Sequence, residues 1–108
     1  MKRNLSQKLF DLSGKSIILT GSAGRLGTNF AQILSDAGAD LILVDIDQKN
    51  NEKLEKSISK EFETRCICSN IDITKRTELE KLSKLVVKKF GKVDGLVNNA
   101  FYSPRINI

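Results

Sequence analysis

The sequence predicts an α/β fold, a doubly wound parallel sheet with helices on both of its faces. Two observations predict it. Apolar runs of strand length alternate along the 108 residues with longer segments whose apolar residues recur at helical spacing, and the first run leads straight into a glycine-rich turn. Strands that alternate with helices pair in parallel, and right-handed crossovers give the strand order 3-2-1-4, with the topological switch between the first and fourth strands.

The first unit consists of a strand, a turn and a helix. Residues 17–19 form the apolar run that is typical of a strand buried on both faces. Gly21, Gly24 and Gly27 follow, and glycine lets the backbone bend tightly and approach a ligand with no Cβ in the way. We expect a helix next, ended by Gly38, with one apolar stripe facing inward. The stripe consists of Leu26, Phe30, Ile33, Leu34 and Ala37.

The glycine turn is chemically suited to hold a phosphate. The amides at the start of the helix lack partners, and the helix dipole is positive at that end, so both attract an anion. Residues 41–44 form a second buried strand, and Asp45 follows it about 20 positions beyond the turn, where an acidic residue accepts hydrogen bonds from a ribose. This order predicts a nucleotide site; the alternative is a glycine loop that serves only the packing of helix on strand.

The rest of the chain repeats the unit. A helix begins at Asp47 or Gln48, with Leu54, Ile58 and Phe62 on its inner side, and residues 65–69 form a third strand. Residues 70–74 form a turn in which Thr74 is the expected N-cap of the next helix. That helix covers residues 75–90 and ends at Gly91, and residues 93–98 form the fourth strand. Its inward residues are Leu79, Leu82, Leu85, Val86 and Phe90.

Five segments together resemble the N-terminal half of a short-chain dehydrogenase/reductase. They are residues 12–15, the turn from Thr20 to Gly27, Asp45, the pair Asp72-Ile73, and residues 93–100 with Asn98-Asn99-Ala100. The resemblance covers about residues 10–100 and implies a Rossmann-type sheet of which this chain holds the first four strands. Residues 1–9 are then expected to be a loose leader, and residues 10–108 a partial NAD(P)-binding domain.

The resemblance also implies the roles of individual residues. Gly21 and the backbone of Arg25 and Leu26, with Gly24 and Gly27, would hold the pyrophosphate of a dinucleotide. Asp45 would bind the adenosine ribose, Asp72 and Ile73 the adenine, and Asn98 and Ala100 would border the nicotinamide. Two positions depart from the family pattern. Arg25 replaces the middle glycine of the classical turn, giving the spacing of the extended branch, and Phe101 replaces the glycine that usually follows Asn-Asn-Ala.

Local charge favours NAD over NADP. Asp45 would repel a 2′-phosphate and accept a hydrogen bond from a free 2′-hydroxyl, and Ile46 supplies no compensating cation. Arg25 is the alternative partner for a phosphate, although the pyrophosphate or solvent is its expected neighbour.

By resemblance the function is hydride transfer between a nicotinamide cofactor and a small carbonyl or alcohol substrate. The family uses a Ser, a Tyr and a Lys four residues after the Tyr, because a phenol needs a nearby cation to act near neutral pH. The one tyrosine here is Tyr102, and Ile106 stands four places later, so no catalytic residue is assigned and we expect the chain alone to be inactive. The alternatives are a non-catalytic dinucleotide-binding module, either a pseudoenzyme or a redox sensor, and a methyltransferase.

Composition excludes several other classes. The net charge of +5 comes from basic residues at the amino terminus and along the helix of residues 75–90. On that helix they alternate with glutamates, which is typical of a solvated face, so nucleic acid is not an expected partner. No apolar run reaches membrane length. With no histidine and two cysteines on one strand face, Cys66 and Cys68, we expect no metal site, free thiols and a cytoplasmic location. The full-length protein is expected to be a homo-oligomer. The fourth strand would be an uncovered edge, so we expect this chain to be marginally stable and to aggregate.

Overall fold

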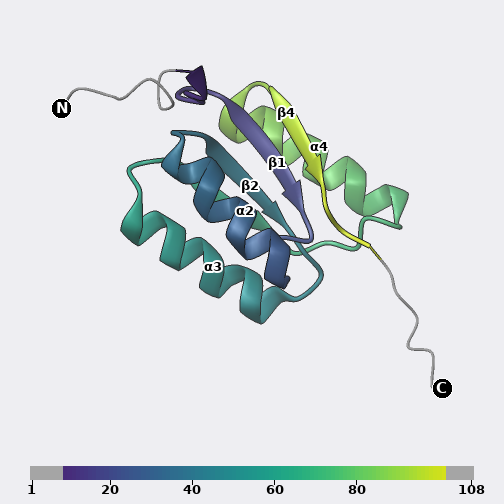
Figure 1. Cartoon of the computed structure of the whole chain (residues 1–108). Helices are drawn as coiled ribbons and strands as arrows, with labels where there is room; N and C mark the ends of the chain where they lie inside the picture. The colour runs from purple at the N-terminus through teal and green to yellow at the C-terminus, as the bar shows by residue number, and fades with distance from the viewer. Residues whose placement is uncertain (1–8, 102–108) are drawn as a thin grey trace.

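A computed structural model describes residues 9–101 of the chain and shows a sheet between two layers of helices (Figure 1). The four strands are parallel in the order β3-β2-β1-β4, which confirms the predicted fold class and strand order. Most of the predicted leader, residues 1–8, lies outside the described residues. The elements are β1 (Ser16–Thr20), α2 (Arg25–Asp36), β2 (Asp40–Val44), α3 (Gln48–Glu61), β3 (Cys66–Ser69), α4 (Arg76–Phe90) and β4 (Gly95–Asn98).

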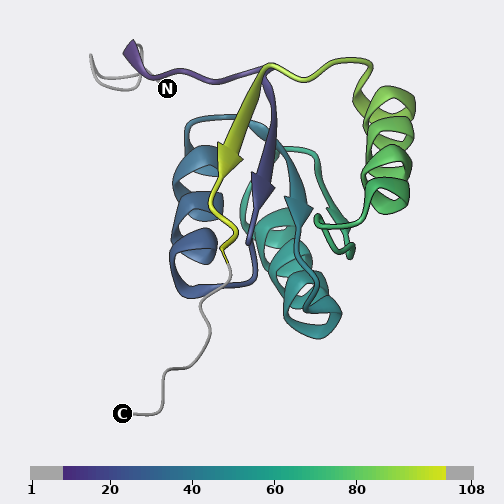
Figure 2. The same cartoon turned by 90° about the vertical axis from the view of Figure 1, so that its right-hand side faces the viewer.

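Each face of the sheet has its own apolar core, because successive residues of a strand point to opposite faces. Leu41 and Leu43 of β2 pack with Ile58 of α3 on one face, under α2 and α3. Ile42 and Val44 pack with Leu82 and Val86 of α4 on the other face. Figure 2 shows α4 on the side of the sheet opposite α2 and α3. This arrangement explains why β2 reads as one continuous apolar run in the sequence.

The predicted inner stripe of α2 is partly wrong. Leu26 and Ile33, which were expected to face inward, are 57% and 65% exposed. The buried residues of α2 are the small ones, Gly27, Ala31 and Ser35, while larger apolar side chains of the helix pack at the sides of the core. The reason is steric: α2 lies so close to the turn after β1 that a Cβ at Gly27 would lie 2.1 Å from the carbonyl oxygen of Gly21.

The start of α4 also differs from the prediction. Lys75, and not Thr74, is the N-cap residue, and it makes no side-chain capping hydrogen bond. The Thr74 hydroxyl donates instead to Oδ1 of Asp72 at 2.6 Å, and the Thr74 amide donates to the same oxygen at 2.9 Å. Leu79 is 42% exposed because it lines an open groove beside Ile18.

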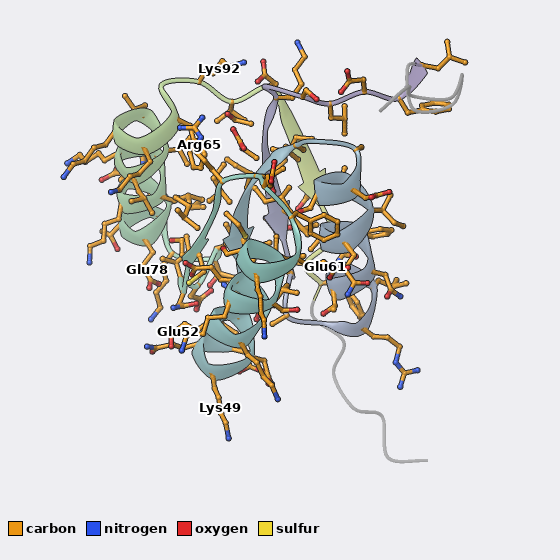
Figure 3. The ribbon with its side chains drawn as sticks, turned by 90° about the vertical axis from the view of Figure 1, so that its left-hand side faces the viewer. Lys49, Glu52, Glu61, Arg65, Glu78 and Lys92 are labelled. Carbon is orange, nitrogen blue, oxygen red and sulfur yellow. The ribbon has the colours of Figure 1, made fainter. Side chains whose placement is uncertain are left out.

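The other helix ends agree with the prediction. Asp47 caps α3 by accepting a hydrogen bond from the amide of Asn50 at 3.2 Å. Gly91 ends α4 in the left-handed conformation, with φ of 73°. At the amino-terminal edge of the sheet, the Arg65 side chain pairs with Asp40 at 3.1 Å and lies over the Phe90 ring at 4.4 Å, which joins the end of α4 to the sheet (Figure 3).

The two cysteines are free thiols that pack on the core under α2 and α3. Burial is the main cause that raises the pKa of Cys66 and of Cys68 to about 12. On the last strand, Leu96 is 61% exposed, and β4 pairs only with β1 in the part of the chain that the structure describes. No helix within residues 9–101 is both long and apolar enough to cross a membrane.

Candidate functional site

A pocket of about 740 Å³ opens at the carboxyl edge of the sheet, where the segments after all four strands meet. The glycine turn after β1 contributes Gly21, Gly24, Arg25 and Leu26. The segments after the other strands contribute Asp45, Asp72, Ile73 and Ala100. The structure therefore brings most of the residues proposed from the sequence to one place. The carboxyl edge of a parallel sheet at its topological switch is where such folds bind their ligands.

Two of the residues proposed from the sequence do not line the pocket. Gly27 is buried beneath the turn, where it allows α2 to pack closely. Asn98 is exposed at the end of β4, and its Oδ1 accepts a hydrogen bond from Oγ1 of Thr20 at 3.3 Å. Tyr102, the sole tyrosine of the sequence, lies outside the described residues.

Several residues that line the pocket were not proposed from the sequence. They are Val44, Ile46, Ile71, Thr74, Asn99 and Phe101. Most of them are apolar, and they form hydrophobic parts of the pocket wall beside the polar groups. The sequence carries one signal that these residues share, because each lies at the end of a strand or within a few residues beyond it. The positions proposed from the sequence were the glycines, the carboxylates and the family-motif residues, and most of the missed positions are apolar neighbours of these.

The glycine turn presents an uncapped helix end to this pocket. Gly21 has φ of +67°, and a Cβ there would lie 2.9 Å from Cα of Ala100, so both its conformation and its surroundings require glycine. The amide of Gly24 donates to the carbonyl of Gly21 at 3.2 Å and closes the turn. Gly24 is the N-cap of α2 and offers no side chain to the first amides of the helix. An anion in the pocket can accept hydrogen bonds from those amides.

The Asp45 carboxylate is fixed beside the turn by two backbone amides. Its Oδ2 accepts from the amide of Ala23 at 2.9 Å, and its Oδ1 accepts from the amide of Asp47 at 2.9 Å. Each carboxylate oxygen can accept more than one hydrogen bond. The group therefore keeps the capacity to accept from hydroxyls in the pocket, in an orientation that the backbone sets.

The Thr20 hydroxyl joins the turn to the segment after β4. Its oxygen accepts from the amides of Asn99 at 3.0 Å and Ala100 at 3.1 Å. The Asn99 side chain donates in turn to the carbonyl of Gly21 at 3.2 Å. These bonds hold two walls of the pocket together, and they explain why a polar residue follows the apolar run of residues 17–19 at the end of β1.

The charges at the pocket are Asp45, Asp72 and Arg25. The hydrogen bonds from the side chain and then the amide of Thr74 lower the pKa of Asp72. Among residues 9–101, no group of three or more histidine, cysteine, aspartate or glutamate side chains is placed to hold a metal ion. The carboxylates of the pocket can accept hydrogen bonds from ligand hydroxyls, and the uncapped start of α2 can hold an anion beside them.

Comparison with known proteins agrees with this geometry. The family model for short chain dehydrogenases matches residues 15–106. Short-chain dehydrogenase reductase 3c of Arabidopsis thaliana is 35% identical over 89 residues, which are 82% of this chain and 33% of the relative. The chain thus spans about a third of the length of such curated relatives.

Solved structures share the fold of the described residues. NAD+-bound xylitol dehydrogenase superposes with a TM-score of 0.80 and 31% identity, covering 84% of this chain and 35% of that protein. L-sorbose reductase from Gluconobacter frateurii, complexed with NADPH and L-sorbose, superposes with a TM-score of 0.84 and 26% identity, covering 92% of this chain and 38% of that protein.

Proposed function

This chain belongs to the short chain dehydrogenase family, and we propose that it is the NAD-binding portion of an oxidoreductase. One observation carries the proposal. The uncapped start of α2 faces a pocket in which the Asp45 carboxylate is held beside the same turn. A dinucleotide needs these two features together, because it carries an anionic pyrophosphate next to a ribose with free hydroxyls.

In this proposal each segment of the pocket binds a different part of the dinucleotide. The pyrophosphate lies at Gly21, Gly24 and the amides of Arg25 and Leu26, with Gly27 behind them. The adenosine ribose lies at Asp45, the adenine at Asp72 and Ile73, and the nicotinamide beside Asn98 and Ala100. The absence of a side chain at Gly21 supports the fit, because it lets the segment after β4 approach the turn so closely that a Cβ would lie 2.9 Å from Cα of Ala100, which brings two walls of the pocket together.

The anchored carboxylate favours NAD over NADP. Because two amides hold Asp45, its charge cannot move away from a 2′-phosphate. Arg25 is exposed at the pocket rim and is the one cation there among the described residues. Similar proteins have been solved with NAD+ and with NADPH, so the choice for this chain rests on Asp45.

The reaction that we propose for the full-length protein is hydride transfer between the cofactor and a small carbonyl or alcohol substrate. The nicotinamide supplies the hydride chemistry when it is bound. The residues of this chain bind and orient the cofactor, and we assign no catalytic acid or base to them. A homo-oligomeric full-length enzyme is part of the same proposal.

Titration of the chain with NADH and NADPH tests the proposal. We expect NADH to bind more tightly than NADPH, and Asp45→Asn to weaken NADH binding by about 10-fold or more, because hydrogen bonds to a charged group contribute about 1.5–3 kcal/mol. Asp36→Asn is the matched control, since Asp36 is exposed at the end of α2 and does not line the pocket. Equal NADH affinity in the wild type and Asp45→Asn would contradict the assignment.

A further inference from the structure

A chain of hydrogen bonds runs beneath the pocket from the glycine turn to the segment after β3. The Ser22 hydroxyl donates to Oδ1 of Asn51 at 2.6 Å. Nδ2 of Asn51 donates to the carbonyl of Leu43 at 3.0 Å and to Oδ1 of Asn70 at 3.1 Å. Ser22 and Asn51 are fully buried.

Asn51 occupies a position where an apolar side chain would be expected. The other buried residues of α3 are Leu54 and Ile58, three and seven positions further on, so Asn51 continues their inward stripe. Burying a carboxamide costs free energy unless its polar atoms find partners. Here both ends of the carboxamide are paired, and its orientation is fixed because the Leu43 carbonyl can only accept.

The partners of Asn51 belong to two separate walls of the pocket. Ser22 lies directly after Gly21 in the turn, and Asn70 lies directly before Ile71, which lines the opposite wall. Asn51 itself does not line the pocket. A fully satisfied buried network holds its members in one arrangement, because any shift leaves a buried polar atom without a partner.

We propose that Asn51 is a positioning residue for the dinucleotide, which sets the spacing between the glycine turn and the wall after β3. The proposal rests on the proposed function, because the two walls are those assigned to the pyrophosphate and to the adenine. A ligand that spans both walls depends on their spacing. A ligand that occupies only the adenosine side does not.

Ser22→Ala and Asn51→Leu test this role, with Ser57→Ala on the exposed side of α3 as the matched control. NADH and adenosine are titrated into each variant at a temperature where circular dichroism shows it folded. We expect both variants to bind NADH about 5–20-fold more weakly, with adenosine affinity within about twofold of the wild type, given a lost buried hydrogen bond. Ser22→Ala removes a single hydroxyl and carries the test if Asn51→Leu does not fold.

The outcomes separate this inference from the proposed function. NADH binding by folded Ser22→Ala at wild-type strength would overturn the positioning role and leave the dinucleotide site intact. Equal losses for NADH and adenosine would overturn it too, since a general loosening of the fold moves both. A wild-type chain that binds no NADH would overturn the proposed function, and the positioning role with it.

Discussion

Replacing Gly27 by alanine should be far more damaging than its small size suggests. The new Cβ would lie 2.1 Å from the carbonyl oxygen of Gly21 and 2.8 Å from Cα of Ser22. Ordinary carbon–oxygen contacts lie near 3.3 Å, so α2 or the turn must move by about 1 Å. Overpacking of this kind costs about 1–3 kcal/mol, and a backbone neighbour places the cost at the upper end. Alanine regains about 1 kcal/mol of helix propensity, which leaves a net loss of about 2 kcal/mol.

Urea unfolding followed by circular dichroism measures this loss, and Gly24→Ala is the matched control. With a slope of about 1–2 kcal/mol per molar urea, the Gly27→Ala midpoint should fall by about 1–2 M. Gly24 has φ of −77°, and a Cβ there would lie 3.4 Å from its nearest neighbour, so Gly24→Ala should cost only the preference for glycine over alanine at an N-cap, less than about 1 kcal/mol. Equal midpoints for the two variants would refute the close approach of α2 to the turn.

Two further predictions concern titration and thiol chemistry. The Lys92 side chain and the Ser16 amide lower the pKa of Asp94 below 3.8, so its contribution to stability is present above that pH and is lost as the pH falls below it. Asp94→Asn should therefore show a shallower fall of the urea midpoint on acidification, and an unchanged acid profile would contradict this. Cys66 and Cys68, each with a pKa of about 12, should react slowly with a disulfide reagent at pH 8 and rapidly after unfolding. Fast reaction of both thiols in the native protein would contradict their raised pKa values.

The topology could be predicted because it depends on features that a sequence displays directly. Apolar runs and their spacing predicted the alternation of strands and helices, and right-handed crossovers then gave the order of the strands. The carboxyl edge of such a parallel sheet gathers Gly21, Asp45 and Asp72. Packing at close range was not predictable in this way. Leu26 and Ile33 match helical spacing, yet α2 turns its small residues to the sheet because the turn leaves no room for larger ones.

The polar groups that hold the pocket together were also missed. Asn51 lies in a helix rich in lysine and glutamate, where an asparagine is expected to face water, and only the fold brings Ser22 and Asn70 to it. Thr74 matched the composition of an N-cap, but the nearer Asp72 took its hydroxyl. Asn51 was missed because its partners are distant in the sequence, whereas Thr74 was assigned wrongly because a local hydrogen bond to Asp72 competed with the helix cap.

The most direct test of the central claim is to follow the amide chemical shifts of the chain by NMR while NAD is added. The account places the pyrophosphate against the first turn of α2, so the largest shifts should fall on the amides of Gly24, Arg25 and Leu26, with smaller ones at Asp45 and Asp72. The same titration of Asp45→Asn should need a higher NAD concentration to give the same shifts. Shifts confined to other parts of the chain, or none at saturating NAD, would contradict a dinucleotide site at this turn.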